Sequence, residues 1–121
     1  LDYEAQALFE QATSHNELRI VNKTFIERDP KDLQGLARRL VEKENTLAFL
    51  ISTGEKSLLL FARAENLPYN MNILLKAILS EFSAGRGGGR PAMAQGGGMP
   101  LSSDEASEAL KFALNTVLDN T

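Results

Sequence analysis

Seven of the nine glycines in the chain lie within one stretch, residues 85–98. Glycine has no Cβ atom, so clustered glycines permit positive φ angles and let the backbone approach a ligand or another segment closely, at an entropic cost on folding. We predict an ordered loop for binding or packing here, in preference to a flexible linker. The stretch contains arginine, proline, methionine and glutamine but no serine, which is unlike a typical glycine-rich linker.

The size and composition are those of one soluble globular domain, with 121 residues of which 43% are hydrophobic and 24% charged. The chain has no cysteine, which excludes disulfides and thiolate metal sites and fits a reducing compartment such as the cytoplasm. No segment approaches the roughly 20 apolar residues of a membrane span. The net charge of −3 repels a phosphate backbone, so any nucleic-acid binding must be local. Because the chain starts without Met on a helical pattern, we expect a domain cut from a longer protein.

Four stretches carry apolar residues at the spacing of an amphipathic helix. The first covers residues 1–14, and the last follows Pro100. We assign residues 1–16 to an N-terminal helix that could be the end of a longer helical arm, and residues 17–121 to the globular domain. In chain order, the apolar positions are Leu1, Ala5, Leu8, Phe9 and Ala12; Leu33, Leu36, Ala37, Leu40 and Val41; Met71, Leu74, Leu75, Ile78, Leu79 and Phe82; and Ala106, Leu110, Ala113, Leu114, Val117 and Leu118.

Two of these helices have clear start signals. At Asp29-Pro30, the Asp side chain can accept hydrogen bonds from early N–H groups, and proline at the first position loses no bond. Ser102 or Ser103 can cap the last helix, and the two acidic residues that follow favour its positive end. Both starts are therefore predicted from local chemistry alone.

Three strands are expected from the remaining pattern. Residues 18–25 mix β-branched, apolar and polar side chains, as in a strand with one partly wet face. Residues 47–52 and 58–64 are continuous apolar runs around a turn at residues 53–56, which predicts a hairpin at the centre of the sheet, covered on both faces. The strand–helix–strand order favours a right-handed parallel crossover. The predicted fold is α/β, a single domain with a mixed sheet of three to five strands and about four helices.

No catalytic or metal site is predicted. His15 is the only histidine and has no second soft ligand or nucleophile near it in sequence, so we interpret it as a solvated residue at a helix end. The carboxylates are scattered over polar helix faces, where charge usually serves solubility.

The glycine stretch fails the two common phosphate-binding patterns. A Walker loop requires Gly-Lys-Ser/Thr after a strand, whereas this chain has Arg90-Pro91. The dinucleotide fingerprint is matched only formally, because the stretch follows a predicted helix and Pro91 interrupts the helix start. Arg86 and Arg90 flank the triple glycine and could pair with phosphates or carboxylates. Their alternative role is to cap the C-terminal carbonyls of the preceding helix.

The order Gly-Arg-Gly-Gly-Gly-Arg-Pro-x-Met-Ala-Gln-Gly-Gly-Gly in residues 85–98 resembles the signature of the C-terminal, DHH-associated domain of alanyl-tRNA synthetases. The same domain type occurs in stand-alone alanyl-tRNA editing proteins and, with a Gly-Gly-Gly-His variant, in DHH phosphoesterases. Arg90-Pro91 stands where the phosphoesterases usually carry His, which favours the tRNA branch. The predicted elements also fit, so the resemblance covers nearly the whole chain.

This resemblance implies a domain that binds tRNA, with alanine tRNA as the expected partner, and that positions it for a catalytic domain outside the chain. It implies homodimerisation in several members, no cofactor here, and zinc only in a separate editing domain with His and Cys ligands. The parent would be an aminoacyl-tRNA deacylase or an alanine–tRNA ligase in the cytoplasm. The alternatives are the substrate-binding domain of a DHH phosphoesterase acting on short oligonucleotides, and a dimerisation module. The predicted contact residues are Gly85, Arg86, Gly87, Gly88, Gly89, Arg90, Pro91, Gln95, Gly96 and Gly97.

Overall fold

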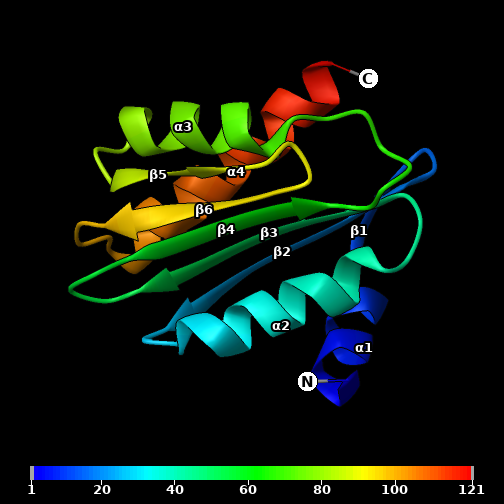
Figure 1. Ribbon diagram of the computed structural model, residues 1–121, viewed down its shortest axis with the longest axis horizontal. Helices are drawn as coiled ribbons and strands as arrows, with labels where there is room; N and C mark the ends of the chain where they lie inside the picture. The colour runs from blue at the N-terminus through cyan, green and yellow to red at the C-terminus, as the bar shows by residue number, and fades with distance from the viewer. Residues whose placement is uncertain (1, 121) are drawn as a thin grey trace.

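The computed structural model describes residues 2–120, which form one six-stranded mixed sheet with helices on both faces (Figure 1). The strand order is β1-β2-β3-β4-β6-β5. The predicted α/β class and four helices are confirmed, and the sheet has six strands where three to five were expected. The bounds are α1 Asp2–Glu10, β1 Thr13–His15, β2 Leu18–Ile26, α2 Pro30–Val41, β3 Thr46–Thr53, β4 Leu58–Arg63, α3 Met71–Glu81, β5 Gly85–Gly89, β6 Met93–Gly98 and α4 Ser103–Asp119.

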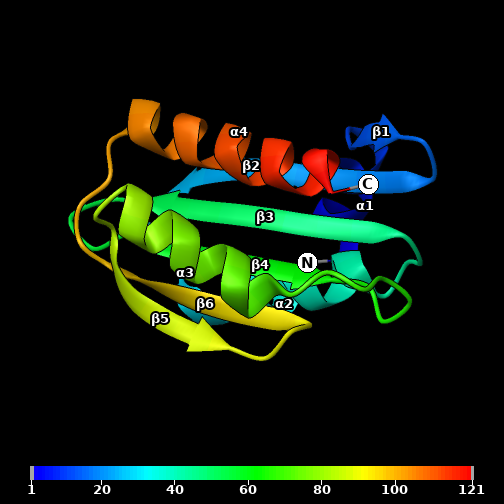
Figure 2. The ribbon, with the colours of Figure 1, turned by 90° about the horizontal axis from the view of Figure 1, so that it is seen from above.

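The centre of the sheet is the predicted hairpin of β3 and β4. β3 is buried along its whole length because helices cover both of its faces, α2 on one side and α3 with α4 on the other (Figures 1 and 2). Phe49 and Phe61 lie opposite one another on the α3/α4 face, with ring centroids 5.1 Å apart. Leu50 and Leu60 lie on the α2 face. β2 runs parallel to β3 through the crossover helix α2, as the strand–helix–strand order predicted.

Side-chain caps fix where three of the helices begin. Asp29 accepts a hydrogen bond from the backbone N–H of Asp32, as expected. Ser102 and Glu105 form a reciprocal capping box at the start of α4. Asn70 caps α3 by accepting from the backbone N–H of Ile73, a signal that the sequence-based prediction did not use.

The N-terminal segment differs from the expectation of a helix over residues 1–14. Leu1 lies outside the described residues, and α1 ends at Glu10. Thr13–His15 then pairs antiparallel with the start of β2, and Asn16 makes the turn with φ of 55°. Asparagine tolerates this left-handed conformation better than other non-glycine residues, so the chain reverses there. His15 is therefore half-buried in a short edge strand and not at a helix end.

α1 packs against α2 and adds Ala5 and Leu8 to the core on that face. Arg28, just after β2, donates two hydrogen bonds to the Glu4 carboxylate, at 2.9 and 2.7 Å. This paired geometry orients α1 relative to the sheet as well as adding charge attraction. None of the helices in residues 2–120 has the length and apolar character needed to cross a bilayer.

Candidate nucleic-acid interface

The glycine stretch is a β-hairpin, which corrects the expected loop. β5 and β6 pair antiparallel on either side of a turn at residues 90–92. β6 also pairs with β4, so the hairpin extends the sheet and β5 becomes its edge (Figure 2). The loop was predicted from the conformational freedom of clustered glycines, and glycine is usually depleted in strands. Here both strands carry glycines, and each strand accommodates the other.

Most of these glycines permit close packing between strands. A Cβ atom at Gly87 would lie 2.3 Å from the Cα of Gly96 on the paired strand. A Cβ atom at Gly97 would lie 2.1 Å from the carbonyl oxygen of Ser57, just before β4. Side chains cannot occupy these positions without moving the backbone. At these positions the glycines therefore have the packing role that was predicted as one alternative.

The outer edge of β5 lies against α3. The backbone N–H of Gly89 donates to Asn72 Oδ1 on α3 at 3.0 Å. N–H groups alternate between the two sides of an antiparallel strand, so Gly87 directs its N–H toward the same edge as Gly89. A helix side chain already satisfies Gly89, so contact with a ligand through that amide would require displacing Asn72.

The turn between β5 and β6 is anchored at its base. Pro91 accepts a hydrogen bond through its carbonyl from the N–H of Met71, and Ala92 accepts one from the N–H of Arg63, at 2.8 and 2.9 Å. Arg90 and Met93 exchange backbone hydrogen bonds across the turn. Pro91 therefore acts in this structure by holding the turn to the start of α3. Such anchoring presents the adjacent side chains from a fixed position.

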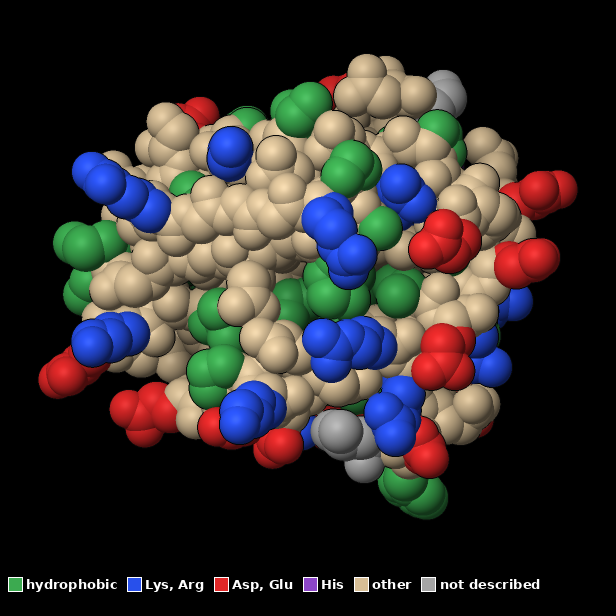
Figure 3. All heavy atoms as spheres, viewed as in Figure 1, with side chains coloured by type: hydrophobic (Ala, Val, Ile, Leu, Met, Phe, Trp, Pro, Cys, Tyr) green, Lys and Arg blue, Asp and Glu red, His purple; other side chains and the backbone are tan. Residues whose placement is uncertain are grey.

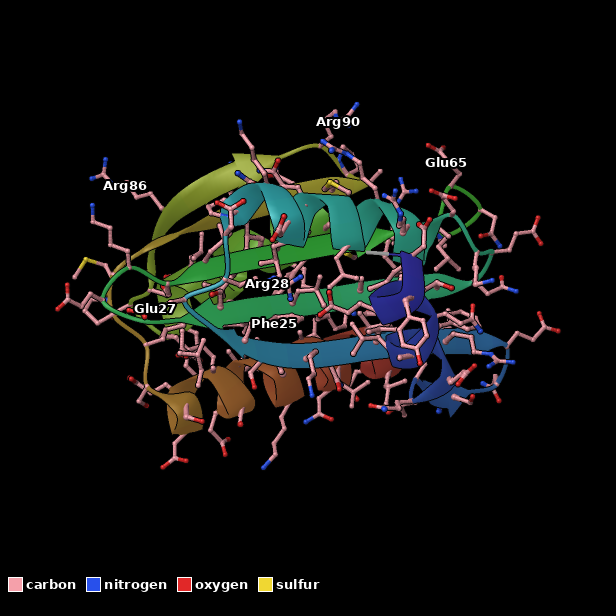
Figure 4. The ribbon with its side chains drawn as sticks, turned by 90° about the horizontal axis from the view of Figure 1, so that it is seen from below. Phe25, Glu27, Arg28, Glu65, Arg86 and Arg90 are labelled. Carbon is pink, nitrogen blue, oxygen red and sulfur yellow. The ribbon has the colours of Figure 1, made fainter. Side chains whose placement is uncertain are left out.

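Arg86 and Arg90 are both exposed, and they do not converge. They lie four residues apart on an extended strand, which separates their Cα atoms by about 13 Å. Figure 4 shows them projecting from opposite ends of the hairpin, with Arg90 beside α2. Neither arginine forms an ion pair or a side-chain hydrogen bond within residues 2–120, so the alternative role as caps of α3 finds no support. The two guanidinium groups are placed to contact separate anionic groups.

Two further cations flank the hairpin, and sequence reasoning missed both. Arg38 on α2 and Lys76 on α3 are exposed, and neither has an ion pair among the described residues. Lys76 lies close to β5, since a Cβ atom at Gly88 would be 3.3 Å from its Cε atom. Neither was predicted as a contact residue, because each is a single charge on the polar face of a helix. Figure 3 shows Lys and Arg side chains gathered over the hairpin and α2, with acidic side chains toward the margins of that face.

A pocket of about 220 Å³ lies between α2 and the hairpin turn. Gln34 on α2 donates through Nε2 to Oε1 of Gln95 on β6, at 2.8 Å, and both side chains line this pocket. Arg38 and Arg90 also line it. Gln95 was among the predicted contact residues, whereas Gln34 was not. The part of the chain that the structure describes contains no group of three His, Cys, Asp or Glu side chains positioned to hold a metal ion.

Comparisons with known proteins agree with this architecture. The chain is 34% identical over 116 residues to an alanine–tRNA ligase of Methanococcoides burtonii, covering 89% of this chain and 12% of that protein. It is 39% identical over 82 residues to an alanine–tRNA ligase of Thermus thermophilus, covering 68% of this chain and 9% of that protein. The chain thus spans about a tenth of the length of these curated relatives.

Solved structures show the same fold. The C-Ala domain of Aquifex aeolicus alanyl-tRNA synthetase superposes with a TM-score of 0.71 at 25% identity, covering 85% of this chain and 96% of that one. A DHH domain from a protein described as a member of a family of ribosomal proteins gives 0.58 at 15% identity, covering 97% of this chain and 30% of that one, and shares the fold alone. The predicted relationship to the C-terminal domain of alanyl-tRNA synthetases is confirmed. The model of the DHHA1 domain matches residues 17–117, and the chain belongs to the DHHA1 domain family.

Proposed function

We propose that this domain contacts tRNA through the β5–β6 hairpin and positions it for a catalytic domain outside the chain. The observation that carries the proposal is the set of four exposed cations on and beside the hairpin, which have no ion pair within residues 2–120. Phosphate contacts from Arg and Lys position a nucleic acid without reading its sequence. The members of the set are Arg38, Lys76, Arg86 and Arg90.

The grouping of these cations supports this assignment. Arg28, Arg39 and Lys111 each pair with a carboxylate. Exposed Lys23, Lys31 and Lys56 also lack an ion pair within residues 2–120, so what distinguishes the four cations is their grouping at one hairpin. From residue 66 to residue 103, three basic side chains stand against one acidic side chain, although the whole chain carries a net charge of −3. A local excess of unpaired positive charge on an acidic protein is the electrostatic footprint of an anionic partner. The separation of Arg86 from Arg90 suits two different phosphates of one backbone.

The parent protein, by this proposal, is an alanyl-tRNA synthetase or an alanyl-tRNA editing protein, and the partner is alanine tRNA. Such a parent either charges tRNA with alanine or hydrolyses mischarged tRNA, and it works in the cytoplasm during protein synthesis. Support comes from the relatives, which are alanine–tRNA ligases. Zinc belongs to a separate editing domain in this scheme. A homodimer stays a prediction of the family resemblance, and sedimentation velocity tests it.

The proposal is tested by replacing Arg86 and Arg90 together with glutamate and measuring tRNA affinity over a range of salt concentrations. The expected result is binding weaker by at least about tenfold, with the dependence of log K on log salt reduced by about two. The control, Lys23→Glu with Lys111→Glu, makes the same charge change at two exposed positions away from the hairpin. Its loss of the exposed pair between Lys111 and Glu108 is expected to change stability little. A folded Arg86/Arg90 variant that binds tRNA like the control would contradict the proposal.

A further inference from the structure

The pocket between α2 and the hairpin turn has chemistry that phosphate binding does not use. A phosphate accepts hydrogen bonds from cations and N–H groups, whereas this pocket also presents the acceptor oxygens of two carboxamides and the half-buried side chain of Met93. Its volume of about 220 Å³ is below the roughly 300 Å³ at which pockets for drug-sized ligands begin. A small, flat group with polar edges and two faces fits such a space.

We propose that this pocket takes one unpaired base of an RNA strand whose phosphates lie on the hairpin cations. The inference rests on the proposed function and adds a ligand class to it. Unpaired bases in RNA are bound by stacking on side chains and by hydrogen bonds to their edges. Both kinds of contact are available here, from different side chains.

The carboxamides supply the contacts to the base edge. The single hydrogen bond from Gln34 Nε2 to Gln95 Oε1, 2.8 Å long, uses one donor and one acceptor of the pair. An amide side chain has two donor hydrogens and an oxygen with two lone pairs, so the pair retains both donors and acceptors for a ligand. Exchanging the amide oxygen and nitrogen of both side chains leaves the same number of free donors and acceptors. The pair can therefore complete a donor–acceptor pattern on one base edge and leave a mismatched pattern unsatisfied.

The rest of the pocket supplies contacts to the base face and the adjoining phosphate. Met93 lies in the pocket lining and packs partly against the core, which gives an apolar surface for the face of a ring. Arg38 and Arg90 come from opposite sides, one from α2 and one from the hairpin turn. A guanidinium plane can stack on a base or form a fork with a phosphate. Arg90 lines this space from the hairpin turn, and Figure 4 shows its side chain projecting outward from that turn.

The test compares binding of tRNA and of single-stranded octamers of A, C and U at low salt, by fluorescence anisotropy. The unaltered chain is expected to prefer one octamer to the weakest by about tenfold, since a matched base edge contributes that much discrimination. Gln34→Leu with Gln95→Leu keeps most of the side-chain volume and removes the amides. In this variant the preference is expected to fall below about twofold, while the salt dependence of tRNA binding is unchanged because the cations remain. The control is Gln11→Leu, which removes an exposed amide beyond α1.

The outcomes separate this inference from the proposed function. If the unaltered chain binds tRNA but binds the three octamers equally or not at all, the base pocket is refuted and the tRNA contact stands. Retention of the preference by the leucine variant refutes it in the same way. If free AMP or CMP competes as strongly as an octamer, the inference is overturned, because the pocket then takes a free nucleotide and not a base within a strand. Failure of the unaltered chain to bind tRNA refutes the proposed function itself.

Discussion

Two adjacent glycines in β6 allow the packing role of the hairpin glycines to be measured. Gly97 and Gly98 both have positive φ, at 145° and 103°. A Cβ atom at Gly97 would lie 2.1 Å from the carbonyl oxygen of Ser57, whereas a Cβ atom at Gly98 would have no neighbour within 4 Å. Alanine at either position incurs backbone strain, and only alanine at Gly97 also meets backbone. The pair therefore separates the conformational contribution from the steric one.

The magnitudes follow from these two contributions. A non-glycine residue held at such φ costs of order 1–3 kcal/mol, and alanine recovers about 0.4–1 kcal/mol by restricting the unfolded chain. Gly98→Ala should therefore lower the free energy of unfolding by about 1–2 kcal/mol. Gly97→Ala has the same backbone strain and in addition pushes β6 away from the start of β4. Overpacking of this kind typically costs about 1–3 kcal/mol. We expect Gly97→Ala to cost about 2–5 kcal/mol, a large part of the roughly 5–15 kcal/mol of a typical domain.

The assay is urea unfolding of both variants and of the unaltered chain at one temperature, followed by circular dichroism. The quantity compared is the free energy of unfolding, with the m-value checked to be constant. A difference of less than about 0.5 kcal/mol between the two variants would show that β4 and β6 are not packed as closely as described. That result would refute the claim that strand packing requires glycine here.

Two further predictions concern stability outside the hairpin. The hydrogen bonds from Arg28 hold the pKa of Glu4 below its ordinary value of 4.5. Glu4 therefore binds a proton more readily in the unfolded chain than in the folded one. The free energy of unfolding should fall as the pH drops from the ordinary pKa through the lowered one. Urea titrations at several pH values measure this fall, and Glu4→Gln should remove the part of it that comes from Glu4. Ser102→Ala removes one half of the capping box of α4 and should cost about 1 kcal/mol by the same unfolding measurement; no loss would mean that the cap does not stabilise the helix.

Local chemistry made most of the scaffold predictable. The helix after Asp29-Pro30 and the capped start of α4 follow from side-chain hydrogen bonds and apolar spacing, and the structure confirms both. The continuous apolar runs predicted the central hairpin because a strand covered on both faces has no polar side. β1 was missed because Thr13–His15 is short and polar, and its only marker was the turn residue Asn16.

The candidate site was harder to predict, because it depends on contacts between distant segments. The glycine stretch was predicted as a loop because clustered glycines permit positive φ angles and close backbone approach. The low strand propensity of glycine also gives no hint of a hairpin. Its use as a hairpin depends on the register, in which Gly85 pairs with Gly98 and Gly87 with Gly96. The available signal was the presence of glycines on both sides of Arg90-Pro91. Arg38 and Lys76 belong to two different helices, α2 and α3, so only the fold brings them beside the hairpin. The DHHA1 family match covers the same elements.

The central claim is that the β5–β6 hairpin and its neighbouring cations form the tRNA-contacting surface. Amide chemical-shift mapping of the ¹⁵N-labelled chain, titrated with an alanine tRNA transcript, tests it most directly. We expect the largest shifts at residues 85–98 and around Arg38 and Lys76, with α4 and β1 little changed. Shifts concentrated on α4 or β1, or no shifts at saturating tRNA, would contradict the account.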